Sequence, residues 1–313
     1  MDAFGGLLEG PRARGAFALR TIMNPPWSVR IEDRAPLSLV AVVRSDAWFV
    51  PDEGEPTCLR PGDVAIMRGP DPYTFADDPA TEPQVVILEG QRCTTPDGEE
   101  VPQAMDLGVR TWGNDLDGSS VMLVGTYETH TEVGQRLLAA LPAAAFLRAP
   151  AWDTPLISVL AMEITKDDPG QDVVLDRLLD LLLVAALRAW FSRPEAEAPA
   201  WYRAQADPLV GRAMAMLHHN PEQPWTVASL AAQLGVSRAL LARRFTELVG
   251  EPPISFLTGW RLALAADLLR EPSSTVGAVA RQVGYSTPYA LSTAFKRAYG
   301  VSPKQHRLMA QAS

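Results

Sequence analysis

Two cysteines are the side chains of this chain best suited to redox chemistry. Cys58 stands two residues before Arg60, and Cys93 directly follows Arg92. Because a nearby arginine lowers the pKa of a thiol and exposure admits an oxidant, Cys93, in an expected loop, is the stronger candidate for a reactive thiol. The cysteines lack a CxxC arrangement, and a lone cysteine also packs as a small apolar side chain. Thiol sensing through Cys58 or Cys93 is therefore one of the interpretations that the sequence leaves open.

Two segments near the C-terminus, residues 228–254 and 277–304, have the same sequence pattern. The glycines Gly235 and Gly284 are 49 residues apart, and the later Phe, Gly and Pro of each copy are 50 residues apart. Each copy predicts a helix, a glycine turn and a second helix, with Thr or Ser at the expected N-caps: Thr226, Ser237, Thr275 and Ser286. One such unit could be an ordinary helical hairpin. Two in tandem predict a DNA-binding paired helix-turn-helix.

The second helix of each copy is expected to have one buried face and one outward face. Apolar residues at i, i+4 and i+7 form the buried face, namely Leu241, Phe245 and Leu248 in the first copy and Leu291, Phe295, Ala298 and Tyr299 in the second. The outward face then consists of Ala239, Ala242, Arg243 and Thr246 in the first copy and of Tyr289, Ser292, Thr293 and Lys296 in the second.

Charge is distributed unevenly along the 313 residues. Residues 201–313 contain 12 Lys and Arg against 6 Asp and Glu, whereas residues 1–200 contain 16 against 31. The basic part suits contact with phosphates, and the acidic part, which DNA repels, is expected to have another role. The Pro, Ala and Glu content of residues 193–200 predicts a linker between them.

The start of the chain has no pattern of an export signal, and the longest apolar run, residues 181–187, is too short to cross a bilayer. We therefore expect a cytoplasmic protein without membrane contact, in which a structural disulfide is not expected.

The first half predicts β-structure. Residues 37–43, 47–50, 63–67, 84–88 and 121–127 are short runs rich in Val, Ile, Leu and aromatic residues, separated by Pro, Gly and Asp. The stretch 59–67 reads as a strand, a tight Pro61-Gly62-Asp63 turn and a second strand. Short strands at this spacing predict a barrel or sandwich. We expect this all-β part to extend over residues 1–136 and a helical segment to follow over 137–192.

A long helix is predicted over residues 172–191. Its charges fall at positions 172, 176, 177, 180 and 188, and it is apolar nearly everywhere else. This apolar arc is too wide for one side of a surface helix. The helix is either buried within its domain or paired with its copy across a homodimer, for which Leu179 and Leu183 would form the seam.

Residues 207–307 resemble the DNA-binding domain of AraC-type transcriptional regulators, most specifically over residues 284–303. The stretch 260–269 is similar to the helix that joins the two readers in that family. The first half resembles the cupin-type sensor domain of a subset of the family, through Pro26-Trp27, the Pro61-Gly62-Asp63 turn and residues 137–142. The resemblance implies four parts: a sensing barrel (1–136), a helical dimerisation segment (137–192), a linker (193–206) and a DNA-binding domain (207–313).

The resemblance also implies the contacts with DNA. The base-contact candidates are the outward residues Ala239, Ala242, Arg243, Tyr289, Ser292, Thr293 and Lys296. Arg238 and Arg244 flank them and are expected to meet phosphate or solvent. Arg243 is the best placed to bond O6 and N7 of a guanine. The alanines depart from the longer polar residues of the family, which puts direct base reading by the first helix in doubt. The partners implied are double-stranded DNA, a small-molecule effector, a second copy and RNA polymerase, without a cofactor.

Many cupins are metal enzymes that bind the ion through several imidazoles. This chain has four histidines, of which only His130 lies in the β half, and Asp71-Pro72-Tyr73 stands where a cupin motif would offer a histidine. His218 and His219 are expected at the end of a helix. A cupin enzyme with a DNA-binding appendage is therefore the less favoured alternative. A cavity without metal remains as a small-molecule site, and its candidate residues are Trp27, Arg30, Trp48, Arg68, Tyr73 and Trp112.

Overall fold

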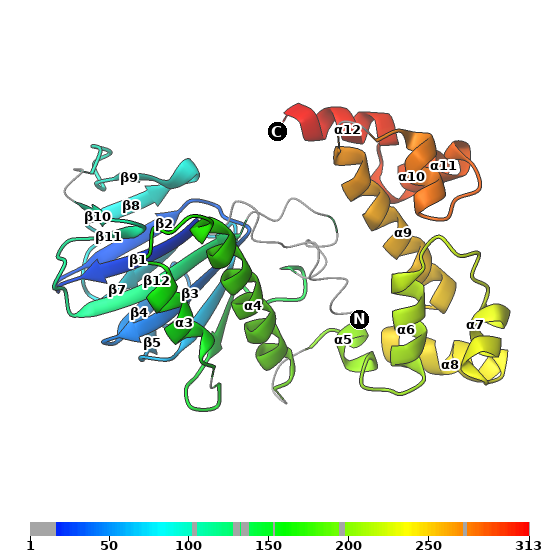
Figure 1. Ribbon diagram of the computed structural model, residues 1–313, viewed down its shortest axis with the longest axis horizontal. Coiled ribbons are helices and arrows are strands. Elements are labelled where there is room, and N and C mark those ends of the chain that lie inside the picture. Colours follow the sequence, from blue (N-terminus) through cyan, green and yellow to red (C-terminus); the bar gives the residue numbers. More distant parts are fainter. Residues whose placement is uncertain are drawn as a thin grey trace. The chain divides into compact units, whose positions relative to one another are not determined.

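The computed structural model describes residues 17–101, 105–127, 132, 138–152, 154–193, 198–271 and 274–312. These residues form two compact units, each of which is described here by itself. The first unit contains the strands and the helices α3 (Leu156–Glu163) and α4 (Gln171–Phe191). The second contains the helices from α5 (Ala200–Ala204) to α12 (Pro303–Ala312) (Figure 1). Among the described helices, none combines the length and the apolarity that a membrane crossing requires.

The first unit is built from two sheets that face each other. The seven-stranded sheet has the order β10-β11-β1-β12-β3-β6-β13, and the six-stranded sheet has the order β5-β4-β7-β2-β8-β9. The strands of the first are β1 (Phe17–Met23), β3 (Leu37–Arg44), β6 (Val64–Arg68), β10 (Asp106–Gly108), β11 (Thr111–Gly113), β12 (Ser120–Tyr127) and β13 (Ala144–Leu147). Those of the second are β2 (Ser28–Glu32), β4 (Ala47–Pro51), β5 (Thr57–Leu59), β7 (Tyr73–Ala76), β8 (Val85–Leu88) and β9 (Arg92–Thr94), with the 3-10 helix η1 (Glu89–Gln91) before β9.

The five strands predicted from the sequence are confirmed as β3, β4, β6, β8 and β12. The Pro-Gly-Asp turn is also confirmed. The Asp63 N–H donates to the carbonyl of Arg60 at 2.9 Å, and Gly62 has a φ of +92°, which favours glycine. This turn carries the chain from β5 in one sheet to β6 in the other.

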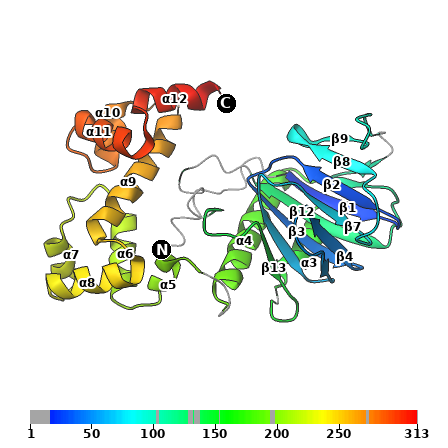
Figure 2. The same cartoon turned by 180° about the vertical axis from the view of Figure 1, so that it is seen from behind.

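Helices α3 and α4 cover the outer face of the seven-stranded sheet (Figure 1). The expected run of helix after residue 137 is interrupted by β13, which pairs with β6 and packs against α4 (Figure 2). The hydroxyl of Tyr127 on β12 donates to the carbonyl of Leu179 at 2.8 Å. Leu179 and Leu183 are each 1% exposed, so they belong to the core, and of the two alternatives for this helix the buried one holds for these residues. The sheet beneath them takes up that face of the helix.

The opposite face of α4 keeps apolar side chains in solvent. Val173 is 61% exposed, Val174 42% and Leu181 51%. The apolar arc of this helix is wide because apolar residues occupy two faces. One face packs in the core, and the other forms an exposed apolar strip.

The second unit contains two helix-turn-helix pairs. Its helices are α5, α6 (Val210–His219), α7 (Val227–Leu234), α8 (Arg238–Val249), α9 (Pro253–Arg270), α10 (Val276–Gln282), α11 (Pro288–Tyr299) and α12. Helices α7 and α8 form the first pair, and α10 and α11 form the second. The stretch expected as a linker, residues 193–206, includes α5, which packs on α8, while residues 194–197 lie outside the described residues.

Three of the four predicted N-caps are confirmed. The side chains of Thr226, Ser237 and Thr275 accept backbone N–H groups of α7, α8 and α10. The prediction of Ser286 as the fourth N-cap is wrong, because Thr287 caps α11: its hydroxyl accepts the N–H of Ala290 at 3.1 Å. Pro288 follows at the first helical position, where its fixed φ suits the helix and its missing N–H costs nothing. The one-residue difference between the copies therefore falls between the glycine turn and the cap.

Candidate functional site

The outward face of α8 is the first candidate DNA-binding surface. Arg238, Ala239 and Arg243 are exposed and Ala242 is half-buried, while Leu241 and Phe245 on the opposite side are fully buried. The Arg243 side chain is 71% exposed, and its nearest carboxylate is that of Glu247 at 3.9 Å, one helical turn away. The guanidinium therefore remains available to a partner outside the chain.

The outward face of α11 is the second candidate surface. Tyr289 is 81% exposed, and Thr293 and Lys296 are exposed beside it. The hydroxyl of Ser292 donates to the carbonyl of Pro288 at 2.8 Å, so its hydrogen is used within the helix. Leu291 and Phe295 face the core as predicted, whereas Ala298, also predicted to be buried, is exposed because it lies at the edge of the apolar face.

Two polar residues near these helices have structural surroundings that the sequence did not predict. Arg244, expected to meet phosphate or solvent, donates through Nε and Nη2 to the carboxylate of Asp207 at 3.0 and 2.8 Å. His218, expected as a helix cap, is buried and stacks on Trp260 with ring centroids 4.3 Å apart. His219 agrees with the expectation, since its Nδ1 lies 2.6 Å from the carbonyl of Ala215 in the last turn of α6.

A cavity between the two sheets is the candidate sensor site. Its interior volume is about 70 Å³, and the figure rises to about 650 Å³ when the open space at its mouth is included. Most of its wall is aliphatic or aromatic: Leu19, Met23, Val29, Ile31, Val40, Phe75, Ile87, Met122 and Val124. A cavity with an apolar wall and a few placed polar groups is the usual form of a small-molecule site.

The predicted ligand residues are distributed among different places. Tyr73 and Trp112 line this cavity. Trp27 is fully buried in the adjoining core, where its indole N–H donates to the hydroxyl of Ser120 at 3.2 Å. These positions follow from the strand alternation, because Tyr73 and Trp112 occupy inward-facing positions.

The other three predicted residues lie away from this cavity. Arg30 is ion-paired with Asp52 at 2.6 Å and with Glu32 at 2.7 Å. Trp48 is a cross-strand neighbour of Cys58 and does not line the cavity. Arg68 lines a separate outer pocket of about 670 Å³, to whose wall Tyr73 also contributes.

The polar residues of the cavity were missed by sequence reasoning. They are Thr21, Asp33, Ser38, Gln91 and Thr126. Ser38 and Thr126 are opposite each other on neighbouring strands, and the side chain of Ser38 is hydrogen-bonded to Tyr73. Burial raises the pKa of Tyr73, so that its hydroxyl stays protonated. The sequence did contain a signal for these cavity residues. Ser38 and Thr126 are polar, whereas the two nearest positions on the same face of each strand, β3 and β12, are apolar.

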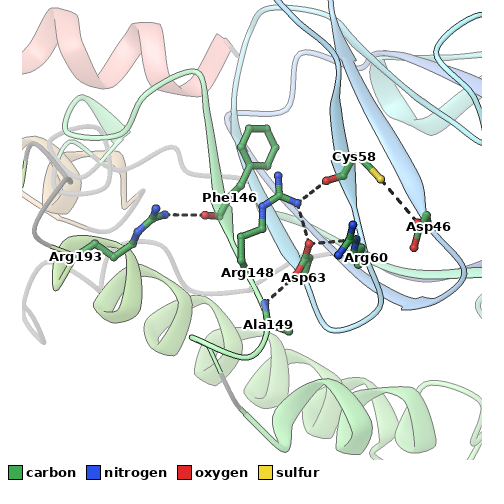
Figure 3. A network of polar contacts seen from close by, with 8 residues as sticks. All are labelled: Asp46, Cys58, Arg60, Asp63, Phe146, Arg148, Ala149 and Arg193. Atoms are coloured by element: carbon green, nitrogen blue, oxygen red, sulfur yellow. Dashed lines mark hydrogen bonds and ion pairs between the residues drawn. The ribbon is translucent and has the colours of Figure 1, made fainter.

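A buried carboxylate joins β13 to the turn before β6 (Figure 3). The side chain of Asp63 is 4% exposed and accepts Nη1 of Arg148 at 2.8 Å. It also accepts the backbone N–H groups of Ala149 at 2.8 Å and of Arg60 at 3.0 Å. Arg148 donates further to the carbonyl of Cys58 at 2.5 Å. The charge on Asp63 is therefore fully hydrogen-bonded, and the network fixes the end of β13 against the six-stranded sheet.

The two cysteines face opposite sides of the six-stranded sheet. Cys93 is opposite Ile87 and packs against the core, whereas Cys58 is opposite Trp48 on the outer face. Burial raises the pKa of the Cys93 thiol, contrary to the lowering expected from Arg92. The pKa of Cys58 is also raised, by burial and then by Asp46, whose carboxylate lies 3.9 Å from the sulfur. These surroundings favour the protonated, less reactive thiol.

Metal-ligating residues do not cluster in the part of the chain that the structure describes: it contains no group of three or more His, Cys, Asp or Glu side chains able to hold an ion. His130 lies outside the described residues.

The architecture is thus a two-sheet β domain with an internal cavity, followed by a pair of helix-turn-helix motifs with exposed second helices. Comparison with known proteins agrees with this class. The family model described as Cupin matches residues 2–192, and the model described as Helix-turn-helix domain matches residues 230–309.

The chain is similar over nearly its whole length to known regulators. It is 34% identical to the HTH-type transcriptional regulator AlkR of Acinetobacter baylyi, over 98% of this chain and 99% of that protein. It is 31% identical to a protein of Streptomyces lividans named as an AraC-like transcription regulator, over 98% of each chain. The solved DNA-binding domain of AdpA in complex with a target DNA is 36% identical, covering 34% of this chain and 96% of that one, with a TM-score of 0.32.

The chain belongs to the AraC-type transcription regulators that carry an N-terminal cupin domain. It is a DNA-binding transcription regulator, as the resemblance predicted.

Proposed function

We propose that the cupin domain binds an apolar small molecule carrying a hydrogen-bonding group, and that this binding controls DNA recognition by α8 and α11. The observation that carries the proposal is the make-up of the cavity between the sheets. Its long aliphatic wall suits an apolar body, and two of its polar residues, Ser38 and Asp33, lie near the hydroxyl of Tyr73.

The polar part of the cavity supports a ligand that donates a hydrogen bond. Ser38 and Thr126 supply hydroxyls on neighbouring strands, and Asp33 supplies a carboxylate near Tyr73. Asp33 accepts the backbone N–H of Ala35 at 3.0 Å and a long bond of 3.5 Å from Gln91. An alcohol or amine at the end of an apolar chain therefore fits these groups better than a purely hydrocarbon compound.

A path of contacts runs from the cavity wall to the end of α4. Tyr73 and Phe75 line the cavity, and their rings lie 5.6 and 5.8 Å from that of Phe49. The ring of Phe49 lies 5.3 Å from that of Phe146 on β13, whose carbonyl accepts Nη1 of Arg193 at 2.8 Å. Arg193 lies two residues after the end of α4, and in the sequence it precedes the connection to the DNA-binding unit. Figure 3 shows its bond to the carbonyl of Phe146. A ligand that displaces Tyr73 would thus alter contacts at the start of that connection.

The exposed apolar strip of α4, formed by Val173, Val174 and Leu181, supports a homodimer. Exposed apolar patches mark surfaces that contact other proteins. We propose that a second copy of the chain packs there and that RNA polymerase is a further partner of the DNA-bound protein.

The experiment that tests the sensor uses straight-chain primary alcohols, with alkanes of equal length for comparison. Val124→Phe places a larger side chain in the cavity, and Val86→Phe, on the outer face of β8, is the matched control. We expect the alcohols to raise the melting temperature of the wild type and of Val86→Phe, and to have no effect on Val124→Phe. An equal rise in Val124→Phe would exclude the cavity as the binding site.

Thiol sensing remains the alternative, and the raised pKa values of Cys58 and Cys93 argue against it. Replacing both by Ser should leave the transcriptional response intact if the cavity is the sensor. A double variant locked in one state under oxidant would favour the thiols.

A further inference from the structure

The two halves of the DNA-binding unit have separate hydrophobic cores, and α9 contributes to both. Phe256 and Leu257, near the start of α9, pack in the first core with the apolar residues of α6, α7 and α8. Leu262, Ala266 and Leu269, further along α9, pack in the second core with those of α10 and α11. A helix alone leaves the two halves free to tilt about it, so additional contacts are needed to fix their relative placement.

Arg261 lies on α9 between the two cores and makes such a contact. Its Nε donates to the carbonyl of Pro221 at 2.6 Å, and its Nη2 donates to the carbonyl of Gln223 at 2.6 Å. Both carbonyls belong to the loop between α6 and α7, which leads into the first helix-turn-helix. The loop is itself braced, because the indole N–H of Trp225 donates to the carbonyl of Asn220 at 2.9 Å.

The turn of the second helix-turn-helix meets the same loop at Gly284. A Cβ at this position would lie 2.7 Å from Nη2 of Arg261, 2.7 Å from the carbonyl oxygen of Pro221 and 2.8 Å from that of Glu222. No side chain fits at these distances without moving the backbone of the loop. Gly284 therefore allows the second turn to approach the loop of the first half.

The equivalent glycine of the first copy has different surroundings. Gly235 has a φ of +71° and Gly284 a φ of +81°, so both need the left-handed conformation that glycine permits. A Cβ at Gly235 would meet no heavy atom within 4 Å. The close approach is thus particular to the second copy and is not a requirement of the turn itself.

We propose that Arg261, the carbonyls of Pro221 and Gln223, and Gly284 form a clamp that fixes the distance and the rotation between α8 and α11. This Arg261 clamp determines which spacing of two base sequences the chain accepts. Arg261 acts as a positioning residue, because its guanidinium is occupied by the loop carbonyls and its planar fork holds both of them together.

The consequence for DNA follows from the geometry of the duplex. One inserted base pair moves the second site by about 3.4 Å along the axis and rotates it by about 35°. Two helices held rigidly relative to each other cannot adjust to both the shift and the rotation, so one of them loses contacts with its site. A loosened pair can follow them in part, at the expense of affinity for the best spacing.

The test uses the full-length protein and a duplex that the wild type selects from random DNA. One base pair is inserted or removed between the two contacted sequences, and the ratio of affinities for the selected and the altered duplex is measured. We expect roughly a 10-fold ratio or more for the wild type, the equivalent of at least one lost base contact. For Arg261→Lys, which keeps the charge but loses the fork, and for Gly284→Ala, we expect the ratio to fall towards 1.

Gly235→Ala is the matched control, since it imposes the same backbone strain without touching the loop. It should keep the wild-type ratio, and circular dichroism should confirm that each variant is folded. If Gly284→Ala does not fold, Arg261→Lys decides the question. A wild-type ratio in folded Arg261→Lys, or a loss in Gly235→Ala as large as in Gly284→Ala, would overturn the proposal.

Discussion

Arg243 and Arg244 are neighbours in the sequence with opposite surroundings, and replacing each by Ala should separate DNA reading from folding. The Arg243 side chain is 71% exposed, and its only near charge among the described residues, Glu247, lies 3.9 Å away on the same helix. An exposed pair at this spacing stabilises a helix by about 0.2–0.5 kcal/mol. If Arg243 bonds a guanine edge, its removal should cost about 1–3 kcal/mol of discrimination, or roughly 5- to 150-fold in affinity for the selected sequence.

Arg244 should behave in the opposite way. Its two hydrogen bonds to Asp207, at 3.0 and 2.8 Å, connect α8 to the start of α6. Backbone N–H groups of Val210 and Leu209, together with Arg244, hold the pKa of Asp207 below its usual range. This stabilisation is present above the unfolded-state pKa and is lost as the pH falls through the lower native value. Because Arg244 is 47% exposed, we expect Arg244→Ala to lower the free energy of unfolding by only about 1 kcal/mol at neutral pH.

Urea unfolding and fluorescence anisotropy give the two measurements on the same full-length proteins. Binding is compared on the selected duplex and on a scrambled duplex of equal composition, at one salt concentration. We expect Arg243→Ala to lose preference for the selected duplex at an unchanged unfolding midpoint, and Arg244→Ala to keep the preference at a lower midpoint. Equal loss on both duplexes for Arg243→Ala would refute its role in base reading.

Two further predictions concern assembly and capping. Leu181→Glu, on the exposed strip of α4, should give a folded monomer in sedimentation velocity. Leu179→Ala, on the buried face of the same helix, should keep the dimer and lower the free energy of unfolding by about 2–5 kcal/mol. An unchanged dimer for Leu181→Glu would exclude this strip as the dimer interface. Thr287→Ala should lower the free energy of unfolding by about 1 kcal/mol, and Ser286→Ala should change it by less than roughly 0.5 kcal/mol. Equal effects on thermal melting would contradict the assignment of the cap.

The DNA-binding half was predictable because its signals are local and occur twice. Helical spacing identified Leu241, Phe245, Leu291 and Phe295 as core, and each of them is fully buried. The error at Ser286 came from carrying the first copy's spacing from glycine to cap into the second copy. The proline after Thr287 moved the start of α11 by one residue, and its preference for the first helical position was the signal that could have located the cap.

The barrel was predictable in its strands and much less in its site. Runs of apolar residues identify strands, but the direction of each side chain depends on the pairing of strands far apart in the sequence. Arg30 and Trp48 suggested a binding site by their residue types, yet their positions on β2 and β4 direct them to the outer face. Ser38 and Thr126 suggested nothing by type, and only the register of β3 against β12 brings them together in the cavity.

The two helices that we propose to read DNA, α8 and α11, offer unequal chemistry to it, and this makes their relative placement important. On its outward face α8 presents the methyl groups of Ala239 and Ala242 beside the guanidinium of Arg243. A methyl group can contact a thymine methyl but donates no hydrogen bond, so it discriminates weakly among bases. Helix α11 presents Tyr289 and Lys296, whose polar groups reach further from the helix axis.

We therefore expect α11 to supply most of the base reading and Arg243 to add a single specific contact. That contact falls on the right base only if the distance between the helices is fixed, which is why a rigid connection through Arg261 would matter more here than in a protein with two equally polar readers.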